Sequence, residues 1–113
     1  MGETEPTIRV QGDVTVIDIK GDVTAQTAVP IEDAYRRASQ AGATKIVLCF
    51  DQTGYINSGG IGVLISIVAE SRKKGQAVRL TGLTAHFQKI FTMVGLTKYA
   101  RAFPSEDAAL KDF

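Results

Sequence analysis

The feature that most constrains the fold of this chain is a nearly continuous apolar run from Ile46 to Phe50, rich in isoleucine and valine. A run of strand length with apolar side chains on both of its faces is typical of a strand that is covered on both sides by other layers. We therefore expect Lys45 to Phe50 to form a central strand of a β-sheet. A loop over residues 51–57 is expected to follow it.

The segment before this run predicts a hairpin and then a helix. Residues 8–10 and 14–19 are apolar at alternate or nearly alternate positions, and Gln11-Gly12-Asp13 between them is a turn sequence. From about residue 28 to residue 40, apolar side chains recur at helical spacing, with charged side chains on the other side. Thr27 is the expected cap of this helix.

The segment after the run predicts further alternation of helices and strands. A helix is expected from Ser58 to about Lys74, ended by Gly75, and a strand over residues 77–80. A helix over residues 85–94 should follow, capped by Thr84, and then a short strand near residues 101–103 and a closing helix after Ser105. The expected buried stripe of the third helix is Phe87, Ile90, Phe91 and Val94.

This order of elements predicts one α/β domain over residues 1–113, with residues 1–6 as a flexible tail. An opening hairpin followed by alternating helices and strands implies a mixed β-sheet with βαβ crossovers and about four helices.

Composition and charge exclude several classes of protein. The chain has 13 lysines and arginines and 12 acidic residues. Its net charge is therefore close to zero and provides no positive electrostatic field that would attract nucleic acid. Its longest apolar stretch, Ile61 to Ala69, falls far short of the roughly 20 residues that a membrane span needs. The N-terminus has no secretory signal, so the expected location is the cytoplasm. The single cysteine, Cys49, lies in the apolar run and is expected to be buried and free.

The segment Ile56-Asn57-Ser58-Gly59-Gly60-Ile61-Gly62-Val63-Leu64 is the least ordinary part of the sequence. Each glycine in a helix costs up to about 1 kcal/mol relative to alanine, so helix stability does not explain three of them. They would leave the hydroxyl of Ser58 open to the approach of another surface. The alternative is that Ser58 caps the helix and the glycines allow tight packing on the sheet.

Catalytic interpretations of this segment fail on spacing. A phosphate-binding loop needs lysine where Gly60 stands, and a dinucleotide fingerprint needs glycine where Ile65 stands. A nucleophile elbow needs glycine in place of Ile56. His86, the only histidine, would have to be the base of a Ser-His hydrolase, which we keep as a third hypothesis. We therefore expect no catalytic residues, no cofactor and no metal site, since one histidine and Cys49 form no ligand cluster.

The second helix carries more apolar side chains than one core stripe requires. The core stripe is expected to be Ile61, Leu64, Ile65 and Val68. Val63 and Ile67 would then point away from its centre and form a partly apolar docking face with Ser58 and Gly59. Contact with a neighbouring helix of the same domain is the alternative. The basic Arg72-Lys73-Lys74 at the end of this helix suits the helix dipole.

The chain resembles a STAS domain, the family of bacterial anti-sigma-factor antagonists and of the cytoplasmic domains of sulphate transporters. The resemblance covers nearly the whole chain, including Ile19-Lys20-Gly21-Asp22, residues 46–51 and residues 91–96. Its most specific element is Asn57-Ser58-Gly59-Gly60-Ile61-Gly62, which is similar to the family's Asp-Ser-Ser-Gly-Leu-Gly. In that family the first serine of the motif is phosphorylated, which implies Ser58 as the phosphorylation site here.

The resemblance implies a regulatory binding module that acts in transcription. Its expected partners are an anti-sigma factor with ATP-dependent serine kinase activity and a protein phosphatase. The expected contact residues are Asn57, Ser58, Gly59, Gly60, Val63 and Ile67. Asn57 and Gly59 depart from the family motif, and Thr24 stands where many members have an acidic residue. The first two departures favour a second hypothesis, an accessory STAS subunit of a larger signalling or transport assembly that is never phosphorylated.

Overall fold

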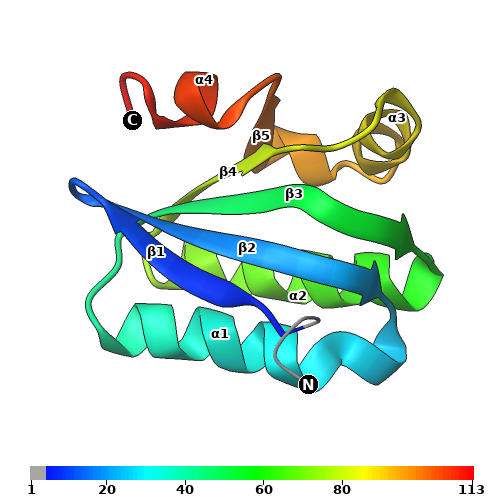
Figure 1. The fold of residues 1–113 in the computed structure, drawn as a ribbon, viewed down its shortest axis with the longest axis horizontal. Helices are drawn as coiled ribbons and strands as arrows, with labels where there is room; N and C mark the ends of the chain where they lie inside the picture. Colours follow the sequence, from blue (N-terminus) through cyan, green and yellow to red (C-terminus); the bar gives the residue numbers. More distant parts are fainter. Residues whose placement is uncertain (1–4) are drawn as a thin grey trace.

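A computed structural model describes residues 5–113 of the chain (Figure 1). The expected flexible tail, residues 1–6, falls largely on residues 1–4, which lie outside the described residues; Pro6 is buried. The elements, in chain order, are β1 (Thr7–Gln11), β2 (Val14–Val23), the 3-10 turn η1 (Ala25–Thr27), α1 (Ala28–Gln40), β3 (Lys45–Ile56), α2 (Ser58–Lys73), β4 (Ala77–Thr81), α3 (Ala85–Met93), the 3-10 turn η2 (Leu96–Lys98), β5 (Ala100–Phe103) and α4 (Glu106–Leu110).

The strands form one mixed sheet in the order β1-β2-β3-β4-β5. β1 and β2 form the expected antiparallel hairpin, and every later neighbour is parallel and joined through a helical connection. α1 and α2 lie side by side along one face of the sheet, and α4 lies on the opposite face (Figure 1). The predicted α/β fold with an opening hairpin and a central β3 is confirmed.

β3 is longer than the sequence predicts. Residues 51–57 were expected as a loop, but the strand continues to Ile56 because Gln52, Thr53 and Ile56 still pair with β2, although the register shifts between Asp18 and Lys20 and again between Gly21 and Val23. Asp51, Gln52 and Tyr55 are exposed, so this half of the strand has the polar composition of a loop. The backbone ladder with β2 decides its structure instead.

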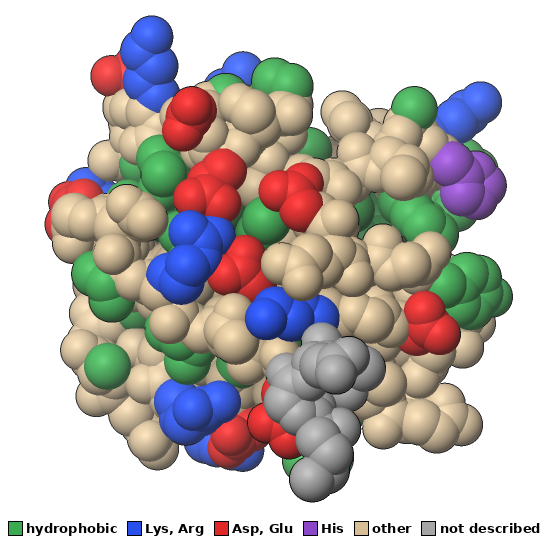
Figure 2. Space-filling view, in the orientation of Figure 1, with side chains coloured by type: hydrophobic (Ala, Val, Ile, Leu, Met, Phe, Trp, Pro, Cys, Tyr) green, Lys and Arg blue, Asp and Glu red, His purple; other side chains and the backbone are tan. Residues whose placement is uncertain are grey.

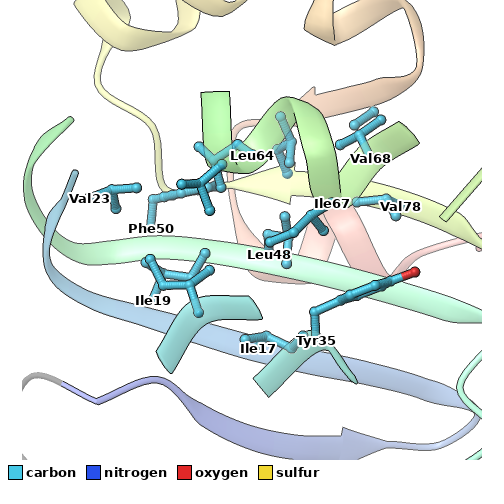
Figure 3. Close-up of a cluster of buried hydrophobic side chains, with 14 of the residues drawn as sticks. Ile17, Ile19, Val23, Tyr35, Leu48, Phe50, Leu64, Ile67, Val68 and Val78 are labelled. Carbon is cyan, nitrogen blue, oxygen red and sulfur yellow. The ribbon is translucent and has the colours of Figure 1, made fainter. Parts of the chain in front are cut away.

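The main core fills the space between the sheet and the helices α1 and α2 (Figure 3). It includes Ile17, Leu48 and Phe50 from the sheet and Leu64 from α2. A smaller apolar cluster lies on the other face and consists of Val14, Val16, Val47, Cys49 and Ala109. Cys49 is free and buried, as predicted. Helices therefore cover β3 on both faces, which explains its continuous apolar run.

The start of α1 differs from the expectation. Thr27 occupies the N-cap position, but its side chain makes no capping bond to α1. Its hydroxyl instead accepts the N–H of Thr24 at 2.9 Å, while the hydroxyl of Thr24 accepts the N–H of Gln26 at 3.1 Å. The extra turn η1 uses both hydroxyls, so the chain caps a 3-10 turn before the α-helix begins. The buried residues of α1 are the predicted Ile31, Ala34, Tyr35 and Ala38.

α3 also buries less than its pattern suggests. Thr84 caps it as predicted, by accepting the N–H of Phe87 at 3.2 Å. Of the expected stripe, only Phe91 is fully buried, Phe87 and Ile90 are half-buried, and Val94 is exposed. Val94 lies beyond the last helical residue, where the chain turns away at Gly95. Among residues 5–113, none of the helices has the length and hydropathy that a bilayer crossing requires.

Candidate functional site

Ser58 is the first residue of α2, and its side chain is exposed. The cap of the helix is Asn57, whose side-chain oxygen accepts the N–H of Gly60 at 2.9 Å. Within residues 5–113, the Ser58 hydroxyl takes part in no hydrogen bond. The alternative in which Ser58 caps the helix is therefore wrong, and the structure leaves the Ser58 hydroxyl free for an external group.

The start of α2 is pressed against the end of β2. The N–H of Asn57 donates to the carbonyl oxygen of Val23 at 3.1 Å. A Cβ atom at Gly60 would overlap that same carbonyl group, so only glycine fits there. Gly60 is buried and was expected as a contact residue for a partner; its role is the close packing of the helix on the strand. This contact fixes where Ser58 lies on the surface.

Gly62 has no such internal reason. A Cβ atom there would meet nothing within 4 Å, and the residue is exposed. The space at Gly59 is between these two cases, because a Cβ atom there would lie 3.1 Å from the Cβ atom of Ala25, a tight contact. A glycine in the exposed interior of a helix costs about 1 kcal/mol relative to alanine. No contact within residues 5–113 accounts for that cost at Gly62. The missing side chain leaves the surface beside Ser58 accessible to another molecule.

Val63 and Ile67 were expected to face outward, and this prediction is wrong. Their side chains are only 8% and 3% exposed, whereas Ile65, expected in the core, is 42% exposed. Figure 3 shows Ile67 among the core side chains, with Leu48 and Val78 of the sheet. The buried residues of α2 are Gly60, Val63, Leu64, Ile67, Val68 and Ser71.

The reason for this error lies in the composition of α2 and in its place in the fold. Apolar side chains surround the first half of the helix, so their pattern does not fix its rotation. The contact between Gly60 and Val23 fixes it instead. α2 also packs against both the sheet and α1, which buries a wide arc that includes Val63 and Ile67. The alternative, contact within the same domain, is correct for these two residues.

The first turn of α2 suits an anion. Within residues 5–113, the N–H groups of Ser58 and Gly59 have no hydrogen-bond acceptor, and no acidic residue lies in the first turn. Unpaired N–H groups and the positive end of the helix dipole stabilise negative charge at this position. A phosphate on Ser58 would therefore be tolerated by the helix that carries it.

Comparison with known proteins decides the family. The model of the STAS domain matches residues 5–109. This chain belongs to the STAS domain family. The predicted resemblance is thus confirmed. The matched residues include all five strands and the helices α1, α2 and α3.

Several solved structures share the fold of this chain at low sequence identity. An anti-sigma factor antagonist from Mycobacterium paratuberculosis is 18% identical, with 93% of this chain and 89% of that chain covered and a TM-score of 0.78. The Bacillus cell fate determinant SpoIIAA in its phosphorylated form is 21% identical, with coverages of 91% and 95% and a TM-score of 0.69. A sulfate transporter family protein from Wolinella succinogenes is 18% identical, with coverages of 90% and 85% and a TM-score of 0.71.

The other candidate groups of this STAS domain lie apart from Ser58 in the hydrogen-bond network. His86 is exposed on α3, and it is the one histidine visible at the edge of the molecule in Figure 2. Among the described residues, no hydrogen bond joins His86 to Ser58. At the basic end of α2, the Nζ atom of Lys74 lies 3.9 Å from the Oε2 atom of Glu70. The guanidinium of Arg72 stacks on Tyr99, with its central carbon 4.0 Å from the centre of the ring.

A cluster of charged residues that the sequence does not reveal lies on the α4 side of the sheet, opposite α1 and α2. Arg9 of β1 forms two hydrogen bonds to Asp18 of β2, at 2.6 and 3.0 Å, and two to Glu106 of α4, at 2.7 and 3.1 Å. Burial alone would raise the pKa of Asp18, but the hydrogen bonds and charge of Arg9 outweigh it and lower that pKa. Glu106 is 97 residues from Arg9, so no local pattern signals this contact.

The same cluster has the residue types and the spacing of a metal site, but its chemistry does not suit one. The Cys49 sulphur lies near the carboxylates of Asp18 and Glu106, within a spacing that a metal ion would need. Arg9 already supplies the positive charge between these carboxylates. Burial raises the pKa of the Cys49 thiol to about 12, so the thiol stays protonated at neutral pH and is a poor metal ligand. The cluster is therefore best described as an ion-pair link between β1, β2 and α4.

Proposed function

We propose that this STAS domain is an anti-sigma-factor antagonist, a regulatory binding module that is switched off by phosphorylation of Ser58. Its partners would be an anti-sigma factor with ATP-dependent serine kinase activity and a protein phosphatase that resets the switch. Binding of the unphosphorylated module would release a sigma factor and so regulate transcription in the cytoplasm.

One observation carries the proposal. Ser58 is exposed at the start of α2, its hydroxyl is free of hydrogen bonds among residues 5–113, and Asn57 performs the capping. The hydroxyl is thus available to a kinase without loss of the cap. Gly59 and Gly62 have no side chains that project beside Ser58, so a protein can approach closely.

The proposed mechanism follows from charge. A phosphate adds about −1.5 to −2 charges at Ser58. The helix start accommodates these charges through the N–H groups of Ser58 and Gly59, so the fold need not change. A closely packed protein interface tolerates them badly, because the phosphate must lose its water or repel carboxylates of the partner. Phosphorylation would therefore act by weakening the interface rather than by rearranging the domain.

The site of phosphorylation can be mapped directly. We expect mass spectrometry to place a single phosphate on Ser58 after incubation with ATP and an anti-sigma factor kinase from the same organism. Ser66 is a suitable internal control, since it is also an exposed serine of α2. Modification of Ser66 or Thr53 without Ser58 would refute the assignment.

The effect of charge can be separated from modification by two substitutions. Ser58→Ala should keep the affinity for the anti-sigma factor within a few fold, while Ser58→Asp should weaken it about tenfold or more, which is about 1.4 kcal/mol. Ser66→Asp places the same charge elsewhere on α2 and should have little effect. Equal affinities of the two Ser58 variants, measured by titration calorimetry, would show that charge at this position does not control binding.

A second function is favoured by the motif departures at Asn57 and Gly59 and by the likeness to the Wolinella sulfate transporter family protein. In that case the domain is an accessory subunit of a larger assembly and is never phosphorylated. Affinity purification from the native cell distinguishes the two functions. Recovery of an ATP-binding kinase supports the switch, and recovery of a membrane complex supports the accessory subunit.

A further inference from the structure

The exposed side of α2 forms a continuous stripe that begins at Ser58. Its members are spaced by three or four residues and are all exposed: Ser58, Gly62, Ile65, Ala69 and Arg72. Residues at this spacing lie above one another on a helix. The α2 stripe therefore extends roughly 21 Å, at about 1.5 Å per residue, from the proposed phosphorylation site to the last turn.

The far end of the α2 stripe opens into an apolar groove between α2 and the segment that joins α3 to β5. Ile65, Val94 and Tyr99 are 42%, 49% and 54% exposed, respectively, although all three are large apolar side chains. We call this the Tyr99 groove; its lining residues are Ile65, Val68, Ala69, Arg72, Val94, Gly95, Leu96 and Tyr99. Large apolar side chains that gather in one exposed depression mark an interaction site more often than isolated ones do.

The charge of the Tyr99 groove is one-sided. Arg72 is its only charged lining residue, and its guanidinium lies 4.0 Å from the centre of the Tyr99 ring. Among residues 5–113, Arg72 forms no salt bridge. Lys98, next to Tyr99 in the chain, adds a second exposed positive charge. An apolar floor beside an unpaired guanidinium is complementary to an apolar side chain that is accompanied by a carboxylate.

The size of the groove favours a protein segment over a small molecule. Its volume is about 210 Å³, below the roughly 300–1,000 Å³ that is typical of small-molecule sites. A space of this size accommodates an anchor side chain of a helix or loop, which is how interface hot spots are commonly built.

We propose that the Tyr99 groove receives an apolar anchor side chain of the protein partner that contacts Ser58, with an acidic residue beside the anchor that pairs with Arg72. This inference rests on the proposed function, because it assigns to one partner both ends of the α2 stripe. The partner would contact Gly62 between the two ends, where the missing side chain allows a helix or loop to lie close to α2.

The test uses the full chain and the anti-sigma factor kinase of the same organism in titration calorimetry. Ile65→Glu and, from the opposite wall, Val94→Glu should each weaken binding about tenfold or more. Arg72→Gln should weaken it less and should reduce its sensitivity to salt, because a charge pair is lost. Ser66→Glu is the matched control on α2, because Ser66 is exposed but does not line the Tyr99 groove, and this variant should bind as the unaltered protein does.

The outcomes separate this inference from the proposed function. Loss of binding in Ser58→Asp together with unchanged binding in Ile65→Glu and Val94→Glu would overturn the groove and leave the switch intact. A protein that does not bind the kinase at all would overturn both. A self-associating protein whose Ile65→Glu variant is monomeric in sedimentation would also overturn the inference, since the occupant of the groove would be a second copy. Thermal melting of each variant shows whether lost binding reflects lost folding.

Discussion

The two faces of the β-sheet are held to their helices by different forces. Under α1 and α2 the sheet contributes a large apolar core, including Ile17, Leu48 and Phe50 (Figure 3). Under α4 the apolar cluster is small, and it gives way to the ion pairs of Arg9 with Asp18 and Glu106. The helix that carries Ser58 is thus anchored by contacts that do not titrate, whereas the C-terminal helix depends partly on charge.

This difference bears on how the proposed switch would work. Each fully buried valine, leucine or isoleucine contributes about 1.5–3 kcal/mol, and α2 contributes several of them to the core. Ion pairs with partly exposed side chains contribute about 0–1 kcal/mol, and more when several hydrogen bonds form a network. A phosphate on Ser58 would therefore appear on a firmly anchored helix, and its effect should be felt by a partner rather than by the core.

The largest expected effect is on stability, and it distinguishes the buried side of α2 from its exposed side. Two isoleucines that are two residues apart in the sequence provide the test. Ile67→Ala should lower the free energy of unfolding by about 2–5 kcal/mol, because it leaves a cavity among Leu48 and Val78. Ile65→Ala should change it by no more than about 1 kcal/mol, since that side chain is 42% exposed. Chemical denaturation of both variants measures the difference. Similar losses for the two would mean that α2 is rotated relative to the structure described above.

The sequence was sufficient to predict the elements of the apolar face. Its patterns predicted the opening hairpin, the apolar half of β3, its central place in a mixed sheet, and α1, because apolar burial leaves a local period in the sequence. The rotation of α2 escaped prediction for the same reason. When apolar side chains occur on most sides of a helix, the period is lost, and the tertiary contacts of the helix, including the close contact of Gly60 with Val23, determine which side faces inward.

The site was predicted only in part. The unusual glycines and the family motif drew attention to Ser58, whose exposure is confirmed. That Asn57 takes over the capping, which leaves the Ser58 hydroxyl free, required the geometry of the helix start. The Tyr99 groove and the Arg9 cluster join residues that are distant in the sequence, so no local pattern indicates them.

A smaller effect on stability is expected on the face of the sheet under α4, which carries the ion pairs of Arg9. Arg9→Met keeps much of the side-chain stem but leaves Asp18 and Glu106 without their shared cation. We expect a loss of about 1–2 kcal/mol in unfolding free energy, less than for a fully buried pair because the arginine side chain is 37% exposed. Asp13→Asn is the matched control. It breaks a pair with Lys45 whose aspartate is 75% exposed, and it should cost much less stability than Arg9→Met does. Equal losses in the two variants would show that the Arg9 network adds nothing to an ordinary surface pair.

The smallest effect should be the part of the pH dependence of stability that arises from the ion pair of Asp18 with Arg9. Because the folded-state pKa of Asp18 is lowered, its contribution is present above its unfolded pKa of about 3.9 and is lost as the pH falls through the folded value. The unfolding free energy of the unaltered protein should therefore fall more steeply between about pH 5 and pH 2 than that of Asp18→Asn, in which the residue cannot ionise.

The difference between the two slopes measures the contribution of Asp18 and its bonds to Arg9. Amide hydrogen exchange should locate the same effect in the structure. On acidification, protection should fall at Ala109 of α4 before it falls at Leu64 of α2, because only α4 depends on this ion-pair network. Identical slopes, or an earlier loss at Leu64, would mean that acid weakens both faces alike and that the charged cluster is not what holds α4 in place.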